Sequence, residues 1–87
     1  MQDYILAIFS IRTSTMQFAS LLQKNGIRSV VVETPKSASA SCGISVRFPT
    51  IYLSQAKEIL QRSGINNFVR FYYVTENLGK KRLTTMV

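Results

Sequence analysis

The sequence has one cysteine, Cys42, and no histidine among its 87 residues. A single cysteine excludes an internal disulfide, a Cys-X-X-Cys redox pair and a metal site built from clustered cysteines. The lack of histidine removes the usual general base and the usual zinc ligand. Much of the enzyme chemistry that depends on these groups is therefore excluded, and we expect no metal site.

Acidic residues are also scarce, because the chain has only four of them. They are Asp3, Glu33, Glu58 and Glu76. Their wide spacing gives no sign of the paired carboxylates that serve acid–base catalysis.

The chain has no long apolar run, and the longest is Tyr4–Phe9. A helix that crosses a bilayer needs about 20 apolar residues. Asp3 stands where a signal peptide needs positive charge, and Tyr4–Phe9 is too short for a signal-peptide core. We therefore expect a cytoplasmic protein with no membrane association.

The composition is that of a small packed domain, with 46% hydrophobic and 17% charged residues. A chain of this length forms one domain. We assign residues 1–76 to that domain. Residues 77–87 lack periodicity and are expected to form a basic, flexible C-terminal tail.

Positive charge predominates, with a net charge of +7 and a pI of about 10.1. The basic residues are dispersed except for the cluster Lys80-Lys81-Arg82. Such a surface attracts polyanions or an acidic protein partner without base specificity. Dispersed positive charge also serves solubility alone.

Apolar periodicity predicts four strands and two helices. The helix starts are Ser10–Ser14, with Ser14 and Gln17 at capping-box spacing, and Pro49-Thr50. Asn25-Gly26 and Ser63-Gly64 are typical of left-handed helix ends. The predicted strands are Tyr4–Phe9, which should be central and buried, then Ile27–Glu33, Ile44–Phe48 and Phe68–Thr75.

The two halves of the chain resemble each other at an offset of 38, where residues 21–27 and 59–65 each end a helix before a strand. Two β-α-β halves give the order βαββαβ. We therefore predict an α+β, ferredoxin-like fold, with a four-stranded antiparallel sheet and two helices on one face.

The segment Thr34–Gly43 is built from small residues and contains Cys42. The predicted topology brings Cys42 to the end of the sheet where Ser10–Ser14 start the first helix. The helix dipole, with Arg12 and Lys36 nearby, would lower the pKa of the thiol and favour an accessible thiolate. Alternatively, Cys42 is a small hydrophobic residue at the start of a strand.

The chain resembles the DUF3343 family of bacterial proteins, described as putative Se/S carrier protein-like. The residues that carry this resemblance are Thr34-Pro35-Lys36 and the stretch Ser39–Phe48, which contains Ser-Cys-Gly and ends in Arg-Phe. The resemblance covers about residues 3–75. Two departures are Ala40, where the family often has serine, and the tail after Thr75.

The resemblance implies that Cys42 carries sulfur or selenium as a persulfide or selenosulfide, with Ser41 and Gly43 shaping its surroundings. Ser10, Arg12 and Lys36 are the further candidate binding residues from the topology. The partners would be a donor of the cysteine desulfurase or sulfurtransferase type and an acceptor enzyme. The carrier would need no cofactor and would not act as a stand-alone enzyme.

Two other functions are compatible with the sequence. A basic sheet with exposed aromatic residues could bind RNA, with Phe68, Tyr72 and Val74 on one face of the last strand. The third strand lacks the aromatic ribonucleoprotein signature, which makes nucleic acid the weaker alternative. The open sheet face could instead form a homodimer or bind an enzyme partner, with Cys42 incidental.

Overall fold

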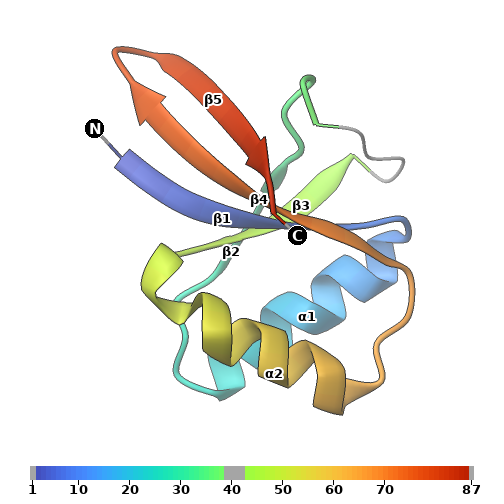
Figure 1. The fold of residues 1–87 in the computed structure, drawn as a ribbon. Helices are drawn as coiled ribbons and strands as arrows, with labels where there is room; N and C mark the ends of the chain where they lie inside the picture. The colour runs from blue at the N-terminus through green and yellow to red at the C-terminus, as the bar shows by residue number, and fades with distance from the viewer. Residues whose placement is uncertain (1, 39–42, 87) are drawn as a thin grey trace.

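The computed structural model describes residues 2–38 and 43–86, and Figure 1 shows an antiparallel sheet with both helices on one face. The α+β class predicted from the sequence is confirmed. The elements are β1 (Gln2–Phe9), α1 (Arg12–Lys24), β2 (Val30–Glu33), β3 (Ile44–Phe48), the 3-10 helix η1 (Thr50–Tyr52), α2 (Leu53–Ser63), β4 (Phe68–Asn77) and β5 (Lys80–Thr85).

The sheet has five strands in the order β2-β3-β1-β4-β5, so the predicted four-stranded sheet is wrong. The additional strand, Lys80–Thr85, lies within the segment assigned to an irregular tail. It pairs with β4 from Tyr72 opposite Thr85 to Asn77 opposite Lys80. Sequence periodicity missed this strand because only Leu83 among its six residues is even partly buried.

Strand β1 lies at the centre of the sheet, as its apolar sequence predicted. It pairs with β3 on one side and with β4 on the other. All residues of Tyr4–Phe9 are buried, because helices cover one face and other segments cover the opposite face. A continuous apolar run is the pattern expected of a strand buried on both faces.

Helix α1 begins at Arg12, so the predicted capping box at Ser14 is wrong. Ile11 takes the N-cap position with extended backbone angles, and Ser14 lies within the first turn. Ser14 is buried because it faces the sheet with Phe18 and Leu22. The several Ser and Thr residues before the apolar stripe left the start of this helix ambiguous.

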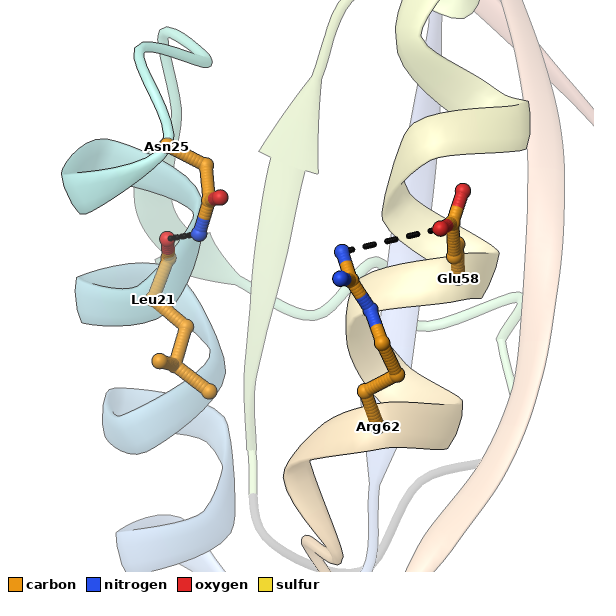
Figure 2. Close-up of polar contacts among 4 residues, drawn as sticks. All are labelled: Leu21, Asn25, Glu58 and Arg62. Carbon is orange, nitrogen blue, oxygen red and sulfur yellow. Dashed lines mark hydrogen bonds and ion pairs between the residues drawn. The ribbon is translucent and has the colours of Figure 1, made fainter.

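The end of α1 confirms the predicted left-handed cap. Gly26 has φ of 76°, its N–H donates to Gln23 O, and the Ile27 N–H donates to Leu22 O. These two bonds, with Leu22 and Ile27 both buried, form a Schellman motif. The Asn25 side chain adds a third bond, at 2.8 Å to Leu21 O (Figure 2).

Helix α2 follows η1 and ends at Gly64, which has φ of 71° and confirms the second predicted cap. Figure 2 shows α2 beside α1, with Arg62 reaching Glu58 at 3.7 Å on the outer surface. Both side chains of this pair are exposed, so it contributes less than about 1 kcal/mol to stability. The helix is held mainly by Ala56 and Ile59, which are buried against the sheet.

Aromatic rings dominate the core between the helices and the sheet. Phe9 is packed between Phe18 and Phe68, with ring centroids 5.3 and 5.4 Å away. Phe48 joins this core through Phe18 and Phe71. The tilted and edge-on arrangements are the favourable geometries for aromatic pairs.

Phe68 lies on the helix-covered face, so the predicted grouping of Phe68 with Tyr72 and Val74 is wrong. The register between β1 and β4 passes from Ile8 opposite Arg70 to Phe9 opposite Phe68. Val69 is therefore an extra residue in β4, which is a β-bulge. A bulge changes the side-chain alternation by one residue, and this brings Phe68 to the same face as Phe71.

The face opposite the helices is covered within the chain. A second cluster of buried side chains lies there, with Val32 and Leu83 packed against it, and its members are Tyr4, Leu6, Ile8, Ala38, Tyr72 and Val74. The segment after β2 contributes Ala38, and β5 contributes Leu83. The open sheet face expected for an RNA-binding or dimer surface is thus largely filled.

Two tyrosine hydroxyls near the start of β1 interact with carboxylates. Tyr4 donates to Glu76 at 3.4 Å, and Tyr73 donates to Asp3 at 2.8 Å. Burial, followed by the charge of Glu76, raises the pKa of Tyr4. The hydrogen bond to Asp3 raises the pKa of Tyr73.

We expect the free energy of unfolding to fall as the pH rises above about 10, the ordinary tyrosine pKa. In that range the unfolded chain loses these two protons while the folded chain keeps them, so the folded state binds more protons and loses stability with rising pH. Urea unfolding at pH 8 to 11 would measure this. A Tyr4→Phe/Tyr73→Phe variant should show a shallower decline, and an unchanged decline would contradict the assignment.

Candidate functional site

The connection between β2 and β3 leaves the sheet from a closed stem. Glu33 pairs with Ile44, and the Thr34 N–H donates to Gly43 O at 2.9 Å. The hydroxyls of Thr34 and Ser45 form a further hydrogen bond between the two sides of the stem. Because Ser45 is fully buried, this bond is shielded from water on the Ser45 side. Both ends of the connection are therefore fixed to the sheet.

The topology brings the end of β1 close to this stem. Ile8 lies opposite Ser45, so β1 ends where β3 begins. We call this the loop end of the sheet, formed by Phe9–Arg12, Thr34 and Gly43–Ser45. Figure 1 shows the start of α1 there, beside the start of β3. Three candidate residues from the sequence, Ser10, Arg12 and Gly43, are thus at one end of the molecule.

Ser10 and Arg12 are both exposed at this loop end. The Ser10 N–H donates to Asn67 O at 2.8 Å, and its hydroxyl lies 3.4 Å from the same oxygen. These bonds connect the start of α1 to the segment before β4. Arg12 is the first residue of α1, where the unpaired N–H groups of a helix carry partial positive charge.

Lys36 is exposed in a turn that follows β2, in which the Ala38 N–H donates to Pro35 O at 2.9 Å. Ala38 itself is buried in the same cluster as Tyr4, Leu6 and Ile8, on the face of the sheet opposite the helices. This turn therefore folds back over the sheet.

Two of the predicted site residues, Cys42 and Ser41, lie outside the described residues. The expected low pKa and accessibility of the Cys42 thiol stay predictions. Within the described part of the chain, no cluster of acidic side chains suitable for a metal ion is present. None of the helices there is long and apolar enough to cross a membrane.

Gly43 adopts a left-handed backbone conformation, with φ of 78°. A Cβ built at this position meets no heavy atom within 4 Å, so space does not exclude a side chain. The backbone conformation disfavours a side chain, because an L-residue in this region is destabilised by about 1–2 kcal/mol. Gly43 is thus required by the backbone of the stem.

We expect Gly43→Ala to lower the free energy of unfolding by about 1 kcal/mol, through backbone strain alone. Chemical unfolding monitored by circular dichroism would measure the loss. Gly43→Asn is the matched control, because asparagine tolerates the left-handed region better than alanine does. Equal losses in the two variants would argue against the backbone explanation.

Sequence reasoning missed three residues that position the loop end, namely Thr34, Ser45 and Ala38. In the sequence, Thr34 stands out only through the family motif, and Ser45 only as part of the predicted strand Ile44–Phe48. Because Ser45 is buried on β3, which pairs with strands on both sides, its hydroxyl needs a partner. The facing Thr34 supplies it, and this polar pair across a predicted hairpin was the available signal.

Comparison with known proteins supports one family. The model of the family described as "Putative Se/S carrier protein-like" matches residues 3–68. No curated protein matches the chain, and no solved structure does so either. The matched region includes β1, α1, the Thr34–Gly43 connection, β3 and α2. Since it covers more than half of the sequence, this chain belongs to the Putative Se/S carrier protein-like family.

Proposed function

We propose that the protein is a small cytoplasmic carrier that holds sulfur, or selenium, on Cys42 and passes it between two enzymes. The observation that carries this proposal is the family match over residues 3–68, which contains the only thiol of the chain. The family name itself describes a carrier of selenium or sulfur. A carrier needs one nucleophilic atom, and Cys42 is the one soft nucleophile of this type in the sequence.

The transfer step is a thiol exchange. The Cys42 thiolate attacks the outer sulfur of a donor persulfide, a new S–S bond forms on Cys42, and the donor's inner sulfur leaves as a thiolate. Oxidation states balance, because the transferred atom remains sulfane sulfur throughout. In the second step an acceptor thiolate attacks that outer sulfur, and the Cys42 thiolate is restored. Neither step needs a second cysteine on the carrier.

The surroundings of the connection support this chemistry. Gly43, the neighbour of Cys42 in the chain, belongs to the same loop end as the first turn of α1 and the exposed Arg12. Positive charge and a helix N-terminus both favour a thiolate and a bound persulfide anion. We include Ser10, Lys36, Ser41 and Gly43 in the proposed site as residues that would contact the transferred atom or the partner.

The partners follow from the same chemistry. The donor would be a cysteine desulfurase or a sulfurtransferase, and the acceptor an enzyme that uses sulfane sulfur or selenium. Any pyridoxal phosphate or metal would belong to those enzymes. The carrier would have no turnover without them. A homodimer of the carrier is also compatible with this function.

We also propose that the fold is a ferredoxin-like domain extended by β5. The order β2-β3-β1-β4, with α1 and α2 as the two crossovers, supports this description. In this view β5 is an added edge strand beyond β4.

The test is to incubate the reduced protein with a cysteine desulfurase and free cysteine, and then to measure its intact mass. The proposal expects a gain of about 32 Da, one sulfur atom, that is lost on reduction with dithiothreitol. The same experiment with a selenium donor would distinguish the two cargoes. No gain in mass with any persulfide donor would contradict the proposal.

A further inference from the structure

We propose that the outer edge of β5 binds an extended acidic segment of a partner protein, which adds to the sheet as a sixth strand. The hairpin of β4 and β5 projects beyond the helices (Figure 1). Apart from Phe68, the first residue of β4, this hairpin lies beyond the region that the family model matches. The proposal concerns this chain's own hairpin and does not depend on Cys42.

Strand β5 is the last strand of the sheet, and no described strand pairs with its outer side. The Met86 N–H donates to Phe71 O, so Met86 points its backbone groups toward β4. In an antiparallel pair, successive residues point their backbone groups alternately inward and outward. Lys81, Leu83 and Thr85 therefore direct their N–H and C=O groups outward, where an added strand can bond to them.

The charge of this edge determines which strand fits. Lys80, Lys81 and Arg82 are consecutive and exposed, and none forms an ion pair with an acidic residue within residues 2–38 and 43–86. Glu76, opposite Lys81, accepts a hydrogen bond from Tyr4 instead. All three basic residues are among those that line a shallow hollow of about 520 Å³ on the hairpin. A strand with carboxylates on alternate residues would match them.

The turn of the hairpin gives a second indication that a partner binds here. Leu78 and Gly79, between the paired Asn77 and Lys80, have φ of 53° and 80°, which is the pattern of a type I′ turn. Asparagine is the residue preferred at the first of these positions. Leu78 instead places an apolar side chain there, 94% exposed. This leucine is unfavourable for the turn and packs on nothing, so a contact with a partner is the role that explains it.

Two other occupants fit less well. A second copy would add its own β5 and bring another chain of net charge +7 against this basic edge, without supplying a row of carboxylates to pair with Lys80 and Arg82. RNA would need exposed rings for stacking. On β4, however, Phe71 and Tyr72 are buried, and the half-buried Tyr73 is held through its hydroxyl to Asp3, so the hairpin offers no row of free rings beside its cations.

The experiment titrates the full chain, labelled with ¹⁵N, with a seven-residue peptide that has Glu at every second position and Thr between. We expect saturable shifts that are largest for the amides of Lys81, Leu83 and Thr85. Shifts spread evenly over all exposed cations would overturn strand addition. Absence of peptide binding, or binding of a single-stranded RNA at the hairpin instead of the peptide, would overturn the proposal of an acidic protein partner.

Three variants sharpen the test. Lys80→Glu/Arg82→Glu should raise the Kd of the peptide at least about tenfold, whereas Lys24→Glu/Lys57→Glu, with the same charge change on the helices, should have a much smaller effect. Leu78→Asn should raise the melting temperature, because it suits the turn, and yet weaken binding. A Leu78→Asn variant that gains stability and binds equally well would remove the role of Leu78.

The peptide titration and the sulfur-transfer experiment can succeed or fail independently of each other. Cys42→Ala should bind the peptide as the native protein does, and the hairpin variants should still accept sulfur on Cys42. A dimer in analytical ultracentrifugation that disappears in Lys80→Glu/Arg82→Glu would overturn the proposal in favour of a second copy.

Discussion

Cys42→Ala is expected to lose the entire sulfur load that the native protein accepts from a persulfide donor. The sequence contains no other thiol, so no second residue can form the S–S bond that holds the transferred atom. Intact-mass measurement after incubation with a cysteine desulfurase and cysteine gives the result directly. The native protein should gain about 32 Da, and the variant should gain nothing.

The control for this experiment is Ser20→Ala, an exposed position on α1 away from the loop end. It should accept sulfur at the rate of the native protein. Circular dichroism should show that Cys42→Ala is folded, since the substitution removes one sulfur atom. Sulfur retained by Cys42→Ala, or release of sulfur from the native protein without a reductant, would contradict a covalent load on this residue.

Phe18→Ala is expected to lower the free energy of unfolding by about 3–5 kcal/mol. Phe18 is fully buried on α1 and packs against Phe9 and Phe48, with ring centroids 5.3 and 6.5 Å away. The change removes a whole ring from the contact between helix and sheet. Because small domains are stable by about 5 kcal/mol or little more, most of the native stability should be lost.

Urea unfolding monitored by circular dichroism would measure this loss. Met16→Ala is the matched control, because Met16 lies on the same helix but is 53% exposed. It should change the free energy of unfolding by less than about 0.5 kcal/mol. A loss below about 1 kcal/mol in Phe18→Ala would show that the aromatic core contributes less than its burial indicates.

Sequence reasoning predicted the elements whose signals are local and repeated. Tyr4–Phe9 has no polar interruption, and it forms the buried central strand. Asn25-Gly26 forms the expected helix end, because only a residue tolerant of the left-handed region fits there. Such features depend on a few neighbouring residues and need no knowledge of the partner strand.

The features that it missed depend on long-range pairing. The face on which Phe68 lies is decided by the bulge opposite Ile8 and Phe9, which no local pattern of β4 reveals. The sequence of β5 is polar because the strand lies at an edge and projects past the helices, so only Leu83 has an apolar neighbour. An edge strand of this kind is hard to distinguish from a polar tail.

The candidate site was predictable to the extent that topology places it. The α+β order was sufficient to bring Ser10, Arg12 and Gly43 to one end, because β1 ends where β3 begins. The hydroxyl pair of Thr34 and Ser45 needed the register of β2 against β3, which the sequence does not specify. The chemistry of Cys42 stays a prediction that the mass experiment tests.

The central position of β1 has a consequence for synthesis of the chain on the ribosome. β1 is made before β4, and its partners in β4 follow 59 to 74 residues later, from Phe9 opposite Phe68 to Gln2 opposite Glu76. Contacts so distant in sequence form slowly. During translation Tyr4–Phe9 is thus an uncharged, β-prone segment without its neighbours, of the type that promotes aggregation. Asp3 is the adjacent charge that opposes such association, so its removal should reduce the soluble yield.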